Sequence, residues 1–175
     1  MSTWLSEEEF RQSGAKSAGV TINVAFLQEI KSDSGFRDQL TEVFQQLKTG
    51  VAHDEEQEKL SPRVAAELLG ELRDGLETYF ALEEFYGYFQ QASVQNPCVG
   101  QAASGLQAQH ESLFLKLNQI VETTQQIVYN ESGPELTLDH VAAELDSFCA
   151  EFNDHEQAEM DLMMRLCNED LGVGD

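Results

Sequence analysis

Residues 138–170 read LDHVAAELDSFCAEFNDHEQAEMDLMMRLCNED, and apolar side chains recur in this stretch at alternating steps of four and three positions. Such spacing is typical of a helix that packs one face into the core of a helical bundle. Two core positions, His155 and Glu159, are polar and lie one helical turn apart. The stretch therefore predicts a core helix with a polar interruption of its apolar face. Its predicted core positions are Val141, Leu145, Phe148, Phe152, His155, Glu159, Leu162 and Leu166.

Proline residues mark the starts of further helices along the chain. Serine and asparagine are favoured helix caps. Proline fits the first helical turn, because a backbone N–H group at that position has no partner within the helix. The prolines stand in Ser61-Pro62, Asn96-Pro97 and Ser132-Gly133-Pro134. The long segments that they delimit are 22–50, 62–91, 97–130 and 138–170.

The pattern within these segments predicts the fold class. None of them alternates apolar and polar residues with a period of two over any length, so we expect no sheet. Long helices joined by short connections indicate an up-down-up-down bundle. The sequence therefore predicts an all-α protein with a polar N-terminal arm at 1–20 and a single four-helix bundle domain at 21–175.

The composition limits the possible partners and the compartment. The 175 residues include 32 acidic and 10 basic side chains, which gives a formal net charge of −22. This charge repels phosphate backbones and anionic lipids, and no apolar run approaches the ~18 residues of a membrane span, so we expect neither a nucleic-acid nor a membrane partner. Three cysteines without CxxC spacing and a polar N-terminus without a signal peptide indicate a reducing compartment, the cytoplasm.

Polar residues also interrupt the predicted core faces of the second and third segments. Glu83 does so in the second segment and His110 in the third, as His155 and Glu159 do in the fourth. The core positions predicted for the second segment are Ala65, Leu69, Leu72, Leu76, Tyr79, Glu83 and Tyr86. Those predicted for the third segment are Leu106, His110, Leu113, Leu117, Ile120, Thr124 and Ile127.

The predicted turns place these polar residues at one level of the bundle. In an antiparallel helix pair, two residues face each other when the turn lies midway between them in sequence. The midpoint of Glu83 and His110 falls on the turn before the third segment, and the midpoint of His110 and His155 falls on the turn before the fourth. We therefore expect Glu83, His110, His155 and Glu159 to converge in one layer.

Such a layer suits a metal ion. Buried carboxylates are costly unless a cation or hydrogen-bond donor faces them. Two imidazoles and two carboxylates match the preferences of iron, manganese or zinc. In the alternative without metal, Glu83–His110 and His155–Glu159 form two satisfied polar pairs. The carboxylates that adjoin the core positions are expected to be solvated: Glu84 and Glu156.

These residues resemble the motifs of the hemerythrin-like (HHE cation-binding) domains. The resemblance spans about residues 24 to 170 and includes the HxxxE pair of the family's last helix, the L-x-x-Q-H-E-x-L of its third, the H-F-x-x-E-E of its second and the I-K-x-D-H of its first. The matching stretches of this chain are, in the same order, His155–Glu159, Leu106–Leu113, Tyr79–Glu84 and Ile30–Ser34. The resemblance implies a four-helix bundle around a non-haem, usually di-iron, site.

The chain departs from the family pattern at two histidine positions. Ser34 stands at the first-helix histidine and Tyr79 at the second-helix histidine, whereas both bridging carboxylates and two histidines are present. The remaining ligand set is enough for one metal ion. Tyr79 either adds a phenolate ligand or caps the site as a neutral phenol, and we favour the neutral role because a phenol is longer than an imidazole. Asp33 is a candidate to reach the site from the first helix.

The resemblance implies a hemerythrin-like binding module that holds iron, or alternatively manganese or zinc, with a role linked to oxygen, nitric oxide or iron. A small diatomic molecule is then the expected ligand of the metal. One alternative is a metal-free helical bundle with a structural or protein-interaction role. A weaker alternative is a di-metal oxidoreductase, which the short ligand set disfavours.

Overall fold

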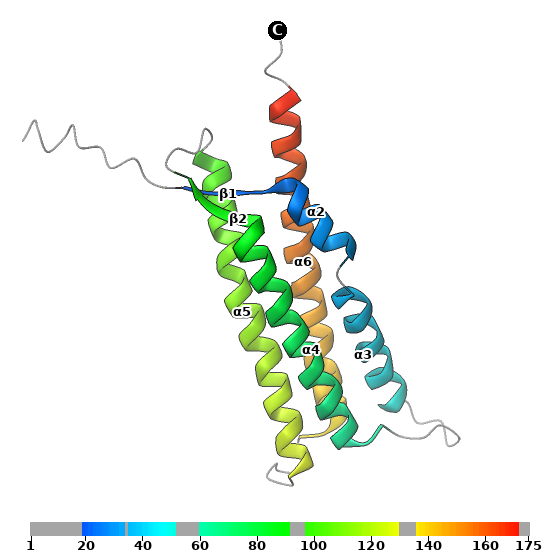
Figure 1. The fold of residues 1–175 in the computed structure, drawn as a ribbon. Helices are drawn as coiled ribbons and strands as arrows, with labels where there is room; N and C mark the ends of the chain where they lie inside the picture. Colours follow the sequence, from blue (N-terminus) through cyan, green and yellow to red (C-terminus); the bar gives the residue numbers. More distant parts are fainter. Residues whose placement is uncertain (1–18, 34, 52–59, 92–96, 130–135, 172–175) are drawn as a thin grey trace, which may run out of the picture.

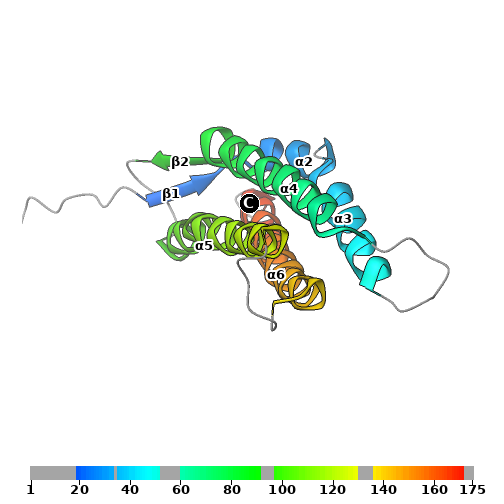
Figure 2. The same cartoon turned by 90° about the horizontal axis from the view of Figure 1, so that it is seen from below.

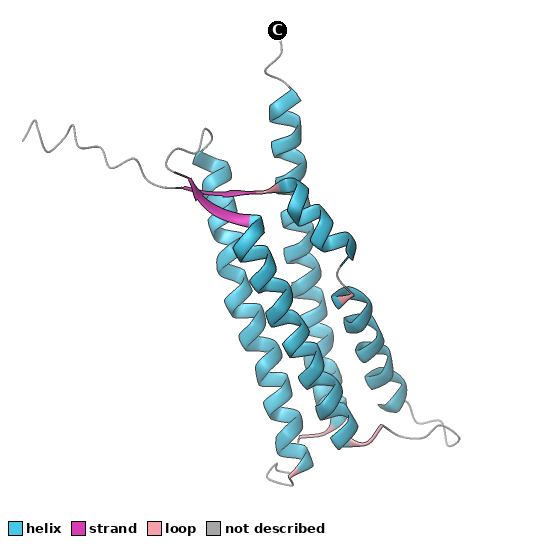
Figure 3. Ribbon diagram, in the orientation of Figure 1, coloured by secondary structure: helices cyan, strands magenta, loops and turns pink. Residues whose placement is uncertain are grey.

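The computed structural model of the chain describes residues 19–33, 35–51, 60–91, 97–129 and 136–171, and most of them are helical (Figures 1 and 3). The α-helices are α2 (Val24–Asp33), α3 (Phe36–Val51), α4 (Pro62–Leu82), α5 (Pro97–Val128) and α6 (Leu138–Leu171). A π-helix and two short strands complete the described elements: η1 (Glu83–Gly87), β1 (Gly19–Ile22) and β2 (Tyr88–Gln91). The prediction of a mainly helical chain is confirmed.

The helices of the second, third and fourth predicted segments start where the sequence predicted. Ser61 caps α4, because its hydroxyl accepts a hydrogen bond from the Val64 N–H at 3.3 Å, and Pro62 occupies the first turn. Helix α5 begins at Pro97. Thr137 precedes α6, and its hydroxyl accepts a hydrogen bond from a backbone N–H of the first turn. Local capping chemistry therefore determines these boundaries.

The long helices pack as a bundle. Helices α3, α4, α5 and α6 form a closed ring of contacts, in which each packs against the next and α6 packs against α3 (Figures 1 and 2). Helix α2 lies beyond α3 along the same side of the bundle (Figure 1). Among the described residues, no helix is both long enough and apolar enough to cross a membrane.

The first predicted helix, at 22–50, was wrong as a single element. The structure divides it into α2 and α3, and the second helix begins after Gly35, whose carbonyl accepts the N–H of Gln39 at 2.9 Å. Glycine is unfavourable inside a helix, so a break at Gly35 is cheap. The break allows α2 to lie along the same side of the bundle at an angle different from that of α3 (Figure 1).

The expectation of no sheet was also wrong. Strands β1 and β2 pair antiparallel, with Gly19 opposite Gln91 and Ile22 opposite Tyr88. Each strand has only four residues, which is too short to show a clear period of two. The pairing also joins the end of the predicted arm to the end of the second segment, a long-range contact that no local pattern reveals. The rest of the arm, at 1–18, lies outside the described residues.

The buried side chains form two apolar clusters with a polar layer between them. On α5, Leu113 belongs to the larger cluster and Leu106 to the smaller, with His110 between them. On α6, Phe152 belongs to the larger cluster and Leu162 to the smaller. The candidate site therefore lies where the bundle passes from one apolar cluster to the other.

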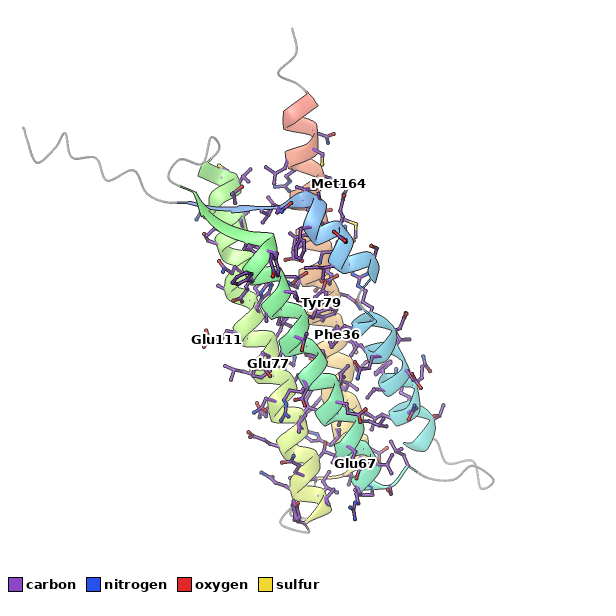
Figure 4. All side chains as sticks on the ribbon, viewed as in Figure 1. Phe36, Glu67, Glu77, Tyr79, Glu111 and Met164 are labelled. Atoms are coloured by element: carbon purple, nitrogen blue, oxygen red, sulfur yellow. The ribbon has the colours of Figure 1, made fainter. Side chains whose placement is uncertain are left out.

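Most of the acidic side chains lie on the outside of the bundle, as Glu67, Glu77 and Glu111 show in Figure 4. Tyr79 and Phe36 lie inside, between α4 and α3, with their rings stacked at a centroid distance of 5.6 Å. The carboxylates that point inward are therefore exceptions, and each needs a specific partner.

Gly87 is needed because helix α2 crosses close to it. A Cβ atom at this position would lie 3.0 Å from Leu27 Cγ and closer still to Leu27 Cδ2. Leu27 is fully buried, and the Asn23 N–H donates to the Gly87 carbonyl at 2.6 Å, so neither group can easily move away. We expect Gly87→Ala to lower the free energy of unfolding by about 1–3 kcal/mol, measured by urea denaturation.

Gly105 provides the matched control for this substitution. It lies on an exposed face of α5, and a Cβ atom there would meet nothing within 4 Å. Gly105→Ala should leave stability unchanged or raise it by up to about 1 kcal/mol, because alanine favours helix. Equal effects of the two substitutions would show that the contact with Leu27 is unimportant.

Candidate metal centre

Glu83 is the first residue of the π-helix η1, which follows directly after α4. The wider turn of η1 closes with a hydrogen bond from the Tyr88 N–H to the Glu83 carbonyl. Because a π turn contains an extra residue, the four-and-three spacing fails after Glu83. Tyr86, predicted to lie in the core, is 51% exposed, and Tyr88 is buried instead. The prediction for Tyr86 was therefore wrong.

The structure brings together the four residues that the sequence placed in one layer. Glu83, His110, His155 and Glu159 are all buried, and one ligand atom from each lies within 4.8 Å of the others. The residues come from η1, α5 and α6. This group could hold a metal ion.

Three atoms that face the centre of this group have no hydrogen-bond partner: Glu83 Oε2, His110 Nε2 and His155 Nε2. The opposite ring nitrogen of each histidine is held, because His110 Nδ1 lies 3.0 Å from Glu84 Oε1 and His155 Nδ1 lies 3.0 Å from Gln109 Oε1. In the neutral rings the protons are therefore on Nδ1, and the Nε2 lone pairs point inward. Metal-binding histidines are typically oriented by such outer hydrogen bonds.

The spacing between the inward atoms also suits a cation. His110 Nε2 lies 3.6 Å from Glu83 Oε2 and 3.8 Å from Glu159 Oε1, and His155 Nε2 lies 3.7 Å from Glu159 Oε1. These distances exceed hydrogen-bond lengths, so the histidines and carboxylates do not satisfy one another as polar pairs. Ligands held about 2.0–2.2 Å from a tetrahedral metal are about 3.4 Å apart. The three separations above are therefore close to the spacing of metal ligands, and all four ligand atoms lie within 4.8 Å of one another.

A buried lysine that the sequence analysis missed enters the same layer. The Lys31 ammonium donates to Glu159 Oε2 at 2.5 Å, to Glu156 Oε1 at 2.7 Å, to the Tyr79 hydroxyl at 3.2 Å and to Glu83 Oε1 at 3.3 Å. Its side chain is only 9% exposed. It neutralises carboxylates on two other elements, η1 and α6.

A signal for Lys31 is present in the sequence. It follows the buried Leu27 by four positions and the buried Ile30 by one, so it lies on the core stripe of α2. The family resemblance points instead to Asp33 and Ser34 in this segment. The side chain of Asp33 and all of Ser34 lie outside the described residues.

Glu156, expected to be solvated, is buried, so that prediction was wrong. Its Oε1 accepts hydrogen bonds from Lys31 and from the Tyr79 hydroxyl at 2.8 Å, and its Oε2 accepts one from Arg37 at 2.6 Å. Helix α6 packs against both α5 and α3, so its buried stripe is wider than a single seam. Glu156 follows Phe152 by four positions and lies on this wider stripe.

Glu84 is exposed, as expected, yet it contributes to the layer. Its side chain is 46% exposed and still reaches His110 Nδ1 across the surface between η1 and α5. Gln109 holds His155 in the same way. Neither role is visible in the sequence, because each depends on how two elements meet.

Two tyrosines border the layer as neutral groups. The Tyr79 hydroxyl donates to Glu156, the hydrogen bond expected of a phenol that caps the site, and the Tyr88 hydroxyl donates to Glu159. Burial, together with the nearby Glu83 for Tyr79 and Glu159 for Tyr88, raises the pKa of both phenols far above the usual range. Tyr88 was not predicted as a site residue.

The two carboxylates that face the histidines differ in their affinity for protons. Burial and the charge of Glu159 raise the pKa of Glu83 to about 7. Burial alone would raise the pKa of Glu159, but His110, Lys31 and His155 lower it to about 2. At neutral pH without metal, Glu159 is therefore ionised and Glu83 is partly protonated.

The histidines and Lys31 also titrate differently. Burial lowers the pKa of His155 to about 4, so its ring is neutral at pH 7. Burial also lowers the pKa of His110, but Glu159 and Glu83 outweigh it and hold this pKa above its ordinary value. The pKa of Lys31 is raised as well, because Glu83 and Glu159 outweigh its burial, so Lys31 remains a cation.

Comparisons with known proteins do not assign the chain to a family. No family model, no curated protein and no solved structure matches it. A function for the chain is therefore inferred from the residues of the site and from the motifs in its sequence.

Proposed function

We propose that this chain is a hemerythrin-like module that binds iron, or a similar divalent cation such as manganese or zinc, between Glu83, His110, His155 and Glu159. The main evidence is that His110 and His155 are buried and that their Nε2 atoms have no hydrogen-bond partner and point toward two carboxylates. A buried polar atom without a partner costs about 1–3 kcal/mol, so two such imidazole nitrogens aimed at one point are suited to binding a cation.

Each of the four side chains has a defined part in holding the ion. The two histidines would supply neutral nitrogen ligands, which Glu84 and Gln109 keep in the required orientation. Glu83 and Glu159 would supply anionic oxygen ligands. This mixed set suits ferrous iron, manganese and zinc better than the oxygen-only preferences of calcium or magnesium.

The sequence resemblance supports a role linked to oxygen, nitric oxide or iron. A ferrous ion held here would supply the affinity for small diatomic molecules that such a role requires. The surrounding residues exclude bulk water, because the apolar clusters lie on both sides of the layer. We also propose that the bundle has the up-down-up-down helix arrangement of the hemerythrin-like domains.

A second candidate is a metal-free bundle with a structural or interaction role. Lys31 favours it, since its ammonium already contacts Glu83, Glu156 and Glu159. Lys31 makes no hydrogen bond, however, to either imidazole, and both Nε2 atoms remain without a partner. The metal-binding function is therefore the better supported of the two.

Anaerobic titration of chelator-treated protein with ferrous, manganous and zinc ions tests the proposal. We expect stoichiometric binding by calorimetry and elemental analysis. His155→Ala should weaken it more than 100-fold, because loss of even an outer hydrogen bond to a ligand typically costs 10–100-fold. His140→Ala is the matched control, since His140 is an exposed residue of the same helix and should leave binding unchanged. If the wild type binds none of the three ions, the metal-free candidate is correct.

A further inference from the structure

Glu83 and Glu159 each direct one carboxylate oxygen toward the histidines and the other oxygen toward Lys31. Glu83 presents Oε2 to His110 and Oε1 to Lys31, at 3.6 Å and 3.3 Å. Glu159 presents Oε1 to His110 and His155, and Oε2 to Lys31 at 2.5 Å. The layer therefore has two cation positions, one beside the histidines and one filled by the Lys31 ammonium, and two carboxylates bridge them.

We infer that the Lys31 ammonium permanently occupies the second cation position of this centre, so that the site accepts one divalent metal ion and not a pair. This inference rests on the proposed function and specifies its nuclearity. The ammonium makes the contacts that a second metal ion would make, because it lies against three carboxylate oxygens and one phenol oxygen.

The charges of the buried side chains in the layer also favour a single metal ion. When ionised, the three buried carboxylates Glu83, Glu156 and Glu159 exceed the single buried ammonium of Lys31 by two negative charges. One divalent ion cancels this excess, whereas two divalent ions would leave a buried excess of two positive charges. Arg37 changes little here, because its side chain is 44% exposed and reaches only the outer oxygen of Glu156. A buried net charge is strongly unfavourable, so a single metal ion gives the lowest cost.

Removing the lysine would leave a usable second site. Glu83 Oε1, Glu159 Oε2 and Glu156 Oε1 all point at the Lys31 ammonium and would point at any ion that replaced it. Carboxylate oxygens of this kind suit manganous ions well. The substitution of lysine by methionine keeps most of the side-chain volume and removes only the charge and the hydrogen-bond donors.

Tyr79 alone does not control the number of metals. Tyr79 stands at a histidine position of the family pattern, so Tyr79→His would restore a nitrogen ligand there. In the structure the Tyr79 hydroxyl contacts Lys31 and Glu156, so a histidine at this position would still face the ammonium. We expect Tyr79→His to bind a second ion only when Lys31 is replaced as well.

The experiment compares manganese stoichiometry in the wild type, Lys31→Met and Lys116→Met. Lys116 is the control, because it also pairs with a glutamate, Glu151, but lies on the partly exposed surface. Each protein is stripped of metal, incubated with excess manganous ion, desalted, and analysed by elemental analysis and electron paramagnetic resonance. Circular dichroism of the loaded proteins verifies that each is folded.

We expect one ion per chain in the wild type and in Lys116→Met, with the spectrum of an isolated manganous ion. Lys31→Met should retain two ions per chain, with a spectrum broadened by coupling across the bridging carboxylates. Two ions in the wild type, or one ion in a folded Lys31→Met, would overturn the inference and leave the proposed function intact. Binding of no ion by the wild type would overturn both. If Lys31→Met does not fold, a coupled spectrum in saturated wild type still overturns the inference, and an isolated one supports it.

Discussion

In protein freed of metal, Lys31→Met is expected to lower the free energy of unfolding by about 3–5 kcal/mol, the usual cost of removing one partner from a buried ion pair. The substitution leaves Glu83, Glu156 and Glu159 buried without their shared cation. Protonation of Glu83 relieves only part of this cost, because the other two carboxylates remain close together. Urea denaturation at pH 7 in the presence of a chelator measures the effect.

The same control and a rescue experiment separate charge from packing. Lys116→Met removes an ion pair at the surface and should cost no more than about 1 kcal/mol. Manganous ion should restore much of the stability of Lys31→Met, because the added charge replaces the lost ammonium. A loss below 1 kcal/mol for Lys31→Met would show that the carboxylates do not depend on Lys31.

The second large effect is stabilisation by metal. At a free metal concentration 1,000-fold above the dissociation constant, binding to the folded state alone adds about 4 kcal/mol. For a chain of this length, 1 kcal/mol corresponds to about 2–4 °C, so we expect the melting temperature to rise by about 8–16 °C. His155→Ala should lose this rise, and a rise of equal size in that variant would contradict the assigned ligands.

The metal effect should depend on pH in a defined direction. Because the pKa of Glu83 is raised from 4.5 to about 7 in the folded protein, the stability that protonated Glu83 contributes to the metal-free fold is lost as pH rises from about 4.5 to 7. His155 opposes this change between about pH 4 and 6.5, because its pKa is lowered to about 4. Metal binding needs the ionised carboxylate and therefore must displace a proton below pH 7. The pKa of His110 is also raised, so a proton on its ring competes with the metal as well. The rise in melting temperature should be larger at pH 8 than at pH 5.5, and a larger rise at pH 5.5 would show that protons and metal do not compete.

Much of the bundle and the four candidate ligands could be predicted from local patterns. The core positions of α5 and α6 follow a period that a helix imposes within one segment, so residues such as Leu117 and Phe148 are buried as expected. The two turns predicted at the prolines then place His110 opposite Glu83 and His155. A polar residue on an apolar seam remains visible in sequence, because it interrupts a regular pattern.

The partners of these residues could not be predicted in the same way. Glu156 was expected in water because a single seam underestimates the buried width of a helix that has neighbours on two sides. Tyr88 reaches Glu159 only because the π turn of η1 shifts the chain by one residue. The pairing of β1 with β2 depends on segments far apart in the sequence.

The sequence by itself therefore determined the helical class, the main core faces and the layer that contains Glu83, His110, His155 and Glu159. Helical periodicity and capping are local properties, so they are encoded within each segment. Only the tertiary structure decided that Lys31 enters this layer and which carboxylates it neutralises. The electrostatic balance of a buried site is the sum of charges from elements distant in sequence, so it exists only when those elements pack together.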